Sequence, residues 1–112
     1  MQKYEIETYI TKTGNSPFQE WINALKDDLT KTKLLTRIER ARYGLFGDSK
    51  AIKGAQGIFE MREHYGAGYR IYYSTIKNRI VLLLAGSDKR DQKKAIAKAK
   101  AYLEDYKQET NP

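Results

Sequence analysis

Residues 57–90 constrain the fold more than any other part of the chain, because they have the pattern of three short strands joined by tight turns. The first two runs, 58–64 and 69–76, alternate apolar and polar side chains, as half-buried strands do. The third run, 79–85, contains Ile-Val-Leu-Leu-Leu-Ala, which suits one buried strand. Short turns connect the runs, so we expect an antiparallel meander.

One strand and three helices are expected around this meander. Residues 3–10 alternate as a strand does, and Ser16, Pro17 and Gln19 form a helix start with a cap, a proline in the first turn and a glutamine three residues after the cap. Residues 49–56 have the pattern of an irregular connection. The final helix is expected at about 91–106. Helical spacing predicts a first core face with Trp21, Ile22 and Leu25, and a second with Leu34, Leu35, Ile38, Ala41, Arg42 and Leu45.

These elements predict an α+β fold: an N-terminal strand, a helical hairpin, the three-stranded meander and a C-terminal helix. The length of 112 residues suits a single domain, 1–112. There is no cysteine, no run long enough to cross a membrane and no apolar signal-peptide core at the start. We therefore expect a cytoplasmic protein with no metal and no small-molecule cofactor.

The positive charge is concentrated in one half of the chain. The net charge is +7, yet residues 50–100 hold twelve basic and four acidic residues, whereas the rest holds nine basic and ten acidic residues. A clustered positive field attracts and holds a polyanion, so this asymmetry favours a nucleic-acid partner. The alternative is that the charge only keeps the domain in solution.

Alternation along the strands predicts which side chains share a face of the sheet. If Phe59, Met61, Ile71 and Tyr73 pack under the helices, the opposite face is open. Lys89 and Arg90 then follow at the end of the adjacent strand. The residues expected on the open surface are Glu60, Arg62, His64, Arg70, Tyr72 and Ser74.

Several ordered motifs resemble the RelE/ParE toxin superfamily. They are Met-Arg at 61–62 with Gly-Tyr-Arg-Ile-Tyr-Tyr at 68–73, the apolar third strand, the Lys-Arg pair that follows it, and a closing helix with Ala99, Tyr102 and Leu103. The segment Gly-Asn-Ser-Pro-Phe-Gln-Glu-Trp-Ile at 14–22 and the run Ile-Phe-Glu-Met-Arg at 58–62 resemble its HigB-like branch. The resemblance covers about residues 15–105.

The resemblance implies a small toxin of a type II toxin-antitoxin system with a RelE-like fold. RelE and HigB members cut mRNA in the ribosomal decoding site, whereas ParE members poison DNA gyrase. The implied partners are therefore mRNA, the ribosome and a cognate helix-turn-helix antitoxin, with no membrane. Our first expectation is a metal-independent endoribonuclease that inhibits translation. The alternatives are a gyrase-directed toxin and a non-catalytic RNA-binding relative.

Cleavage of RNA by its own 2′-hydroxyl without a metal needs a base, an acid and cations that offset charge on the phosphoryl oxygens. Arg70 and Arg90 are the first candidates for phosphate stabilisation because the guanidinium group meets phosphate in a bidentate manner, and Arg62 supports them. His64 is the first candidate for the base or acid because imidazole titrates near neutrality, and Glu60 is the second.

Further residues are candidates for RNA contact. Tyr72 could stack a base, although tyrosines are also common in strands for reasons of packing alone. Lys89, Lys53, Lys93 and Lys94 could contact the RNA backbone, and the alternative for the helix lysines is a solvated face.

The chain departs from the family pattern in two places. Ile58 and Glu60 occupy strand positions where some members have lysines, and Ile96 occupies the position where some have a catalytic tyrosine. The resemblance therefore does not assign the general acid and base.

Overall fold

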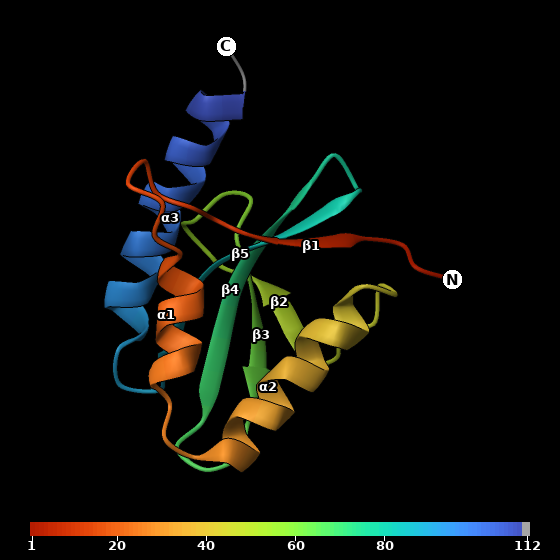
Figure 1. Ribbon diagram of the computed structural model, residues 1–112, viewed down its shortest axis with the longest axis vertical. Coiled ribbons are helices and arrows are strands. Elements are labelled where there is room, and N and C mark those ends of the chain that lie inside the picture. The colour runs from red at the N-terminus through yellow and green to blue at the C-terminus, as the bar shows by residue number, and fades with distance from the viewer. Residues whose placement is uncertain (111–112) are drawn as a thin grey trace.

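The computed structural model describes residues 1–110, which form an α+β fold with a five-stranded mixed sheet and three helices (Figure 1). The elements follow in the order β1 (Glu5–Thr8), α1 (Pro17–Ala24), α2 (Asp28–Ala41), β2 (Ser49–Ala51), β3 (Phe59–Glu63), β4 (Tyr69–Ile76), β5 (Ile80–Asp88) and α3 (Gln92–Thr110).

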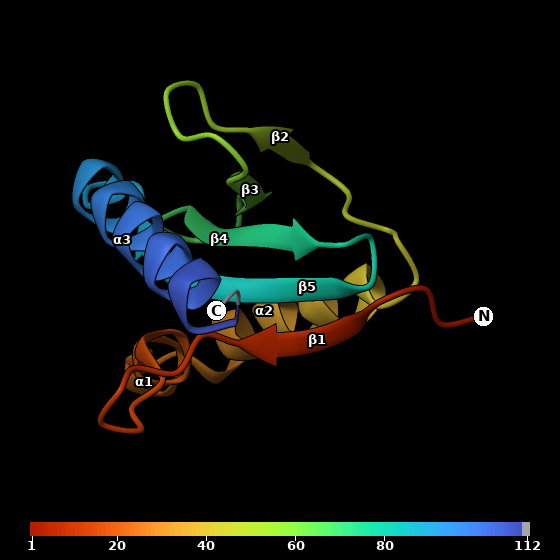
Figure 2. The ribbon, with the colours of Figure 1, turned by 90° about the horizontal axis from the view of Figure 1, so that it is seen from above.

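The sheet has the strand order β1-β5-β4-β3-β2, which Figure 2 shows from above. The predicted meander is confirmed, because β3, β4 and β5 pair antiparallel in sequence order. β1 pairs parallel with β5, along the edge of β5 that faces away from β4. The local signals are also confirmed: the Ser16 hydroxyl accepts a hydrogen bond from the Gln19 amide, 3.2 Å, at the start of α1.

The prediction of an irregular connection at 49–56 is wrong for its first residues. Ser49–Ala51 form the edge strand β2, which pairs antiparallel with β3. A Ser-Lys-Ala segment has neither alternation nor β-branched residues, so only its pairing with β3 makes it a strand.

The sheet is buried on both faces. On one face, α1 and α2 cover a core that includes Phe18 and Leu34, together with Val81 and Leu83 of β5. On the opposite face, α3 packs through Ala95, Ala99 and Leu103 against a second core built from Ile58, Tyr72, Leu82, Leu84 and Ala85. Because apolar residues of β5 point to both faces, each face needs its own helical cover.

The expectation of one open face is therefore wrong for three residues. Tyr72, Ser74 and Glu60 are buried, with 0%, 4% and 4% of their surfaces exposed.

The helical hairpin is also different from the one expected, because α1 and α2 diverge in a V across their face of the sheet (Figure 1). Leu35 and Leu45, which helical spacing placed in the core, are exposed.

None of the three helices formed by residues 1–110 combines the length and the apolar composition that a bilayer crossing needs.

Candidate functional site

The candidate site lies at the end of the sheet where β3 ends, β4 begins and β5 ends. Arg62 of β3 pairs in register with Arg70 of β4, and Arg70 pairs with Ser87 of β5. Directly opposed residues in neighbouring antiparallel strands project to the same face. Two guanidinium side chains are thus neighbours on the face that α3 partly covers.

Asp48 joins two of the predicted site residues. Its Oδ1 accepts a hydrogen bond from Arg62 Nη2 at 2.8 Å, and its Oδ2 lies 2.7 Å from His64 Nε2. The hydrogen bonds from Arg62 and, second, from His64 lower the pKa of Asp48 to about 2. The carboxylate in turn raises the pKa of Arg62. Asp48 is therefore ionised at neutral pH and holds both side chains at the edge of the sheet.

Asp48 is a site residue that the sequence pattern did not predict. Nothing in the local sequence relates Asp48 to residues 62 and 64. The Arg62 amide donates to the Asp48 carbonyl, 2.9 Å, where β2 begins to pair with β3. Recognition of β2 as a strand would have found this contact.

His64 is both anchored and accessible. Its side chain is 76% exposed, and Nε2 is bound to the Asp48 carboxylate. A carboxylate accepts hydrogen bonds, so in the neutral ring it favours the tautomer with the proton on Nε2 and leaves Nδ1 as an acceptor. An oriented imidazole of this kind is able to take a proton from a hydroxyl group.

Glu60 and Arg70 form a largely buried ion pair below this surface. Glu60 Oε2 lies 3.4 Å from Arg70 Nε, and its Oε1 lies 4.0 Å from Lys50 Nζ. Arg70 Nε is buried without a hydrogen-bond partner among the described residues. Glu60 compensates the charge of Arg70 because the two groups are close together. The Glu60 side chain is 95% buried, so it presents little surface to a substrate.

Tyr72 is closed to any partner. Its ring lies in the core under α3, and its hydroxyl forms a 3.1 Å hydrogen bond with the Ser87 hydroxyl. Burial raises the pKa of Tyr72. A buried ring cannot stack on a base, so the prediction of base stacking for this tyrosine is wrong. The alternating pattern of β4 did not reveal which face α3 covers.

The remaining predicted cations lie in different places. Arg90 follows β5 at the same end of the sheet as Arg70, is 87% exposed and pairs with Asp88 at 2.9 Å. Lys89, Lys93 and Lys94 are exposed around the start of α3. Lys53 is also exposed, but it lies in the connection between β2 and β3, beyond the end of β3 opposite to Arg62.

Within residues 1–110, no group of three or more acidic or histidine side chains is placed to hold a metal ion. The candidate site consists of three arginines, one histidine and the carboxylates that position them.

No family model matches the chain. The chain is 42% identical over 83 residues to an uncharacterized protein of Haemophilus influenzae (strain ATCC 51907 / DSM 11121 / KW20 / Rd). The alignment covers 74% of this chain and 82% of that protein.

Proposed function

We propose that the chain, which belongs to one family with this uncharacterized Haemophilus influenzae protein, is a metal-independent endoribonuclease. The proposal rests on the candidate site of the chain. The observation that carries the proposal is the Asp48–His64 pair beside the neighbouring Arg62 and Arg70. This set offers an oriented proton acceptor within a field of fixed cations.

The chemistry follows from these groups. His64 Nδ1 takes the proton of a ribose 2′-hydroxyl while the 2′-oxygen attacks the adjacent phosphorus. The bond from phosphorus to the 5′-oxygen breaks, and the leaving oxygen takes a proton from water. Arg62, Arg70 and the exposed Arg90 offset the charge that grows on the phosphoryl oxygens. The products are a cyclic phosphate and a free 5′-hydroxyl.

The resemblance to the HigB-like branch of the RelE/ParE superfamily supplies the biological part of the proposal. The substrate is mRNA on the ribosome, the outcome is inhibition of translation, and a helix-turn-helix antitoxin silences the protein. The cationic half of the chain suits a site that works against ribosomal RNA.

The test is controlled expression of the wild type and His64→Ala, with the 5′ ends of cellular mRNA mapped. We expect growth arrest with cuts in translated mRNA, and loss of the cuts in the variant. Arg90→Ala is the second variant, because its exposed side chain can be removed without disturbing the core. Lys26→Ala, an exposed change between α1 and α2, is the matched control.

Arg70 needs a more careful variant than alanine. Arg70→Ala would leave the buried Glu60 carboxylate without its nearest cation and would destabilise the fold. Arg70→Lys keeps the charge but removes the bidentate fork, so it isolates phosphate recognition from folding.

One observation favours a second candidate, the non-catalytic RNA-binding relative. With Glu60 buried, His64 is the one predicted proton-transfer residue that is accessible. Absence of arrest together with salt-sensitive RNA binding would select this second candidate. Arrest with intact mRNA and gyrase-dependent DNA breaks would instead select a gyrase-directed toxin.

A further inference from the structure

A slot lies between α1 and α3, where β5 has no neighbouring strand on one side. β1 pairs only with residues 80–83 of β5, and the last backbone contact between the two segments is from the Tyr9 amide to the Leu83 carbonyl, 3.0 Å. Beyond that point, residues 85–88 pair with β4 alone among the strands of the described chain, and Leu84 lies at the register shift between the Ala85 and Leu83 pairs. An unpaired strand edge presents a row of free backbone donors and acceptors.

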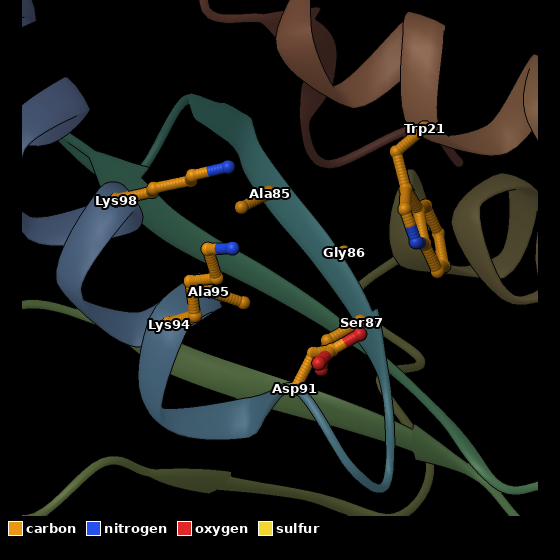
Figure 3. A pocket seen from close by; sticks show the side chains of 8 residues that line it. All are labelled: Trp21, Ala85, Gly86, Ser87, Asp91, Lys94, Ala95 and Lys98. Atoms are coloured by element: carbon orange, nitrogen blue, oxygen red, sulfur yellow. The ribbon is translucent and has the colours of Figure 1, made fainter.

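The slot has a defined shape. Its cavity of about 230 Å³ is bounded by Trp21 of α1, by Ala85, Gly86 and Ser87 of β5, and by Asp91, Lys94, Ala95 and Lys98 at the start of α3 (Figure 3). The Trp21 ring lies directly over Gly86, because a Cβ at this position would be 2.2 Å from the ring. A glycine in the strand therefore allows α1 to form one wall of the slot.

The other wall carries unneutralised positive charge. Lys94 and Lys98 are exposed, and neither forms an ion pair with another described residue. Asp91 is the one carboxylate among the residues that line the cavity. The two lysines are one helical turn apart, a rise of about 6 Å, and alternate side chains of an extended strand are separated by roughly 6.6 Å.

We infer that this slot binds an extended acidic segment of a partner protein, which adds to the sheet beside residues 84–88 of β5. The backbone of the segment pairs with the free edge, and two carboxylates at alternate positions meet Lys94 and Lys98. This inference does not rest on the proposed nuclease function, because none of its evidence involves His64 or the arginines.

Two other occupants fit the slot less well. An RNA strand has phosphates for the lysines, but its backbone has no regular donors for the carbonyl groups of a strand edge. A second copy of this chain would bring its own β5 edge with the same two lysines, so like charges would face each other. The charge and the free edge together thus favour an acidic peptide.

The sole tryptophan of the chain, Trp21, allows a direct test by fluorescence. The probe is a blocked octapeptide that alternates Glu and Val, titrated into the full chain at low salt. We expect saturable binding with a change in Trp21 emission. Lys94→Ala/Lys98→Ala should weaken binding about tenfold, as two exposed ion pairs suggest. Lys100→Ala/Lys107→Ala removes the same charge from α3 outside the slot and should bind as the wild type does.

Two further probes separate strand addition from attraction by charge alone. Two further peptides have the same sequence, one N-methylated at every Glu and the other at every Val. Because successive amides of a strand point to opposite sides, one of these peptides loses the amides that face β5. Strand addition predicts that one methylated peptide fails to bind. Equal binding of both would overturn the inference. So would tighter binding of oligouridylate that depends on Lys94 and Lys98, which would assign the slot to RNA.

Discussion

Asp48 is the residue that joins Arg62 and His64 in the candidate site, and its ionisation gives this contact a defined pH dependence. The folded protein holds the pKa of Asp48 at about 2, below its usual 3.8, through hydrogen bonds from Arg62 and then His64. A lowered pKa contributes stability that is present above the unfolded value and is lost as the pH falls through the folded value. This contribution should disappear between about pH 4 and pH 2.

Asp48→Asn should therefore change the acid side of the stability profile. Asparagine does not ionise, so the variant should lose less stability than the wild type between about pH 4 and pH 2. Urea midpoints measured across this range check the prediction, with Asp28→Asn, an exposed carboxyl at the start of α2, as the control. Parallel profiles for wild type and Asp48→Asn would contradict it.

Gly86 is the second residue whose identity the structure explains. Gly86→Ala places a methyl group in the volume of the Trp21 ring, so we expect a loss of about 1–3 kcal/mol in the free energy of unfolding. Chemical denaturation followed by circular dichroism measures the loss. In a Trp21→Ala background, Gly86→Ala should lower the free energy of unfolding by a smaller amount, because the ring that meets the methyl group is absent. An equal cost in both backgrounds would mean that the contact is not the cause.

At the scale of elements, the end of β1 is fixed to α3 by one tyrosine. The Tyr9 hydroxyl donates to Asp105 Oδ2 at 2.5 Å, and its ring stacks on Tyr102 at a centroid distance of 4.8 Å. Burial and, second, the hydrogen bond to Asp105 raise the pKa of Tyr9 to about 12. A raised pKa gives stability that is complete below about pH 10 and is lost as the pH rises toward 12.

Tyr9→Phe keeps the ring and removes the hydroxyl. We expect a loss of about 1–3 kcal/mol at neutral pH, since the acceptor is a carboxylate. The variant should also lose less additional stability than the wild type between pH 10 and 12. Thermal or urea denaturation across this range is the measurement, and a wild-type alkaline profile in Tyr9→Phe would refute the assignment.

The elements also show which features a sequence reveals. Signals within a few residues were sufficient for the start of α1 at Ser16 and for the turn at 77–78, where Lys77 and Asn78 have φ of 52° and 56°. Pairing between distant segments was not readable. β2 became a strand only through β3, and Asp48 entered the site by the same pairing. Alternation predicted that Arg62 and Arg70 share a face of the sheet, but the burial of Tyr72 depended on where α3 packs.

At the scale of the whole molecule, the two cores on opposite faces of the sheet make β5 the shared layer. Leu82 points into the core under α3 and Leu83 into the core under α1 and α2, and both are almost fully buried. Leu82→Ala and Leu83→Ala should each lower the free energy of unfolding by about 2–5 kcal/mol.

The two variants should differ in where the structure loosens. Amide hydrogen exchange should accelerate in α3 for Leu82→Ala and in α1 for Leu83→Ala, because each change opens a cavity under a different helix. Similar total losses with the same exchange pattern would show that the two faces behave as one core.

The parallel pairing of β1 with β5 also bears on the order of folding. Residues 5–8 pair with residues 80–83, which lie 75 positions further along the chain. The closure of so long a loop is an entropic cost, so we expect it to follow the formation of the meander. We therefore expect β1 to join last, so weakening it through Ile6→Ala should mainly accelerate unfolding and hardly slow folding.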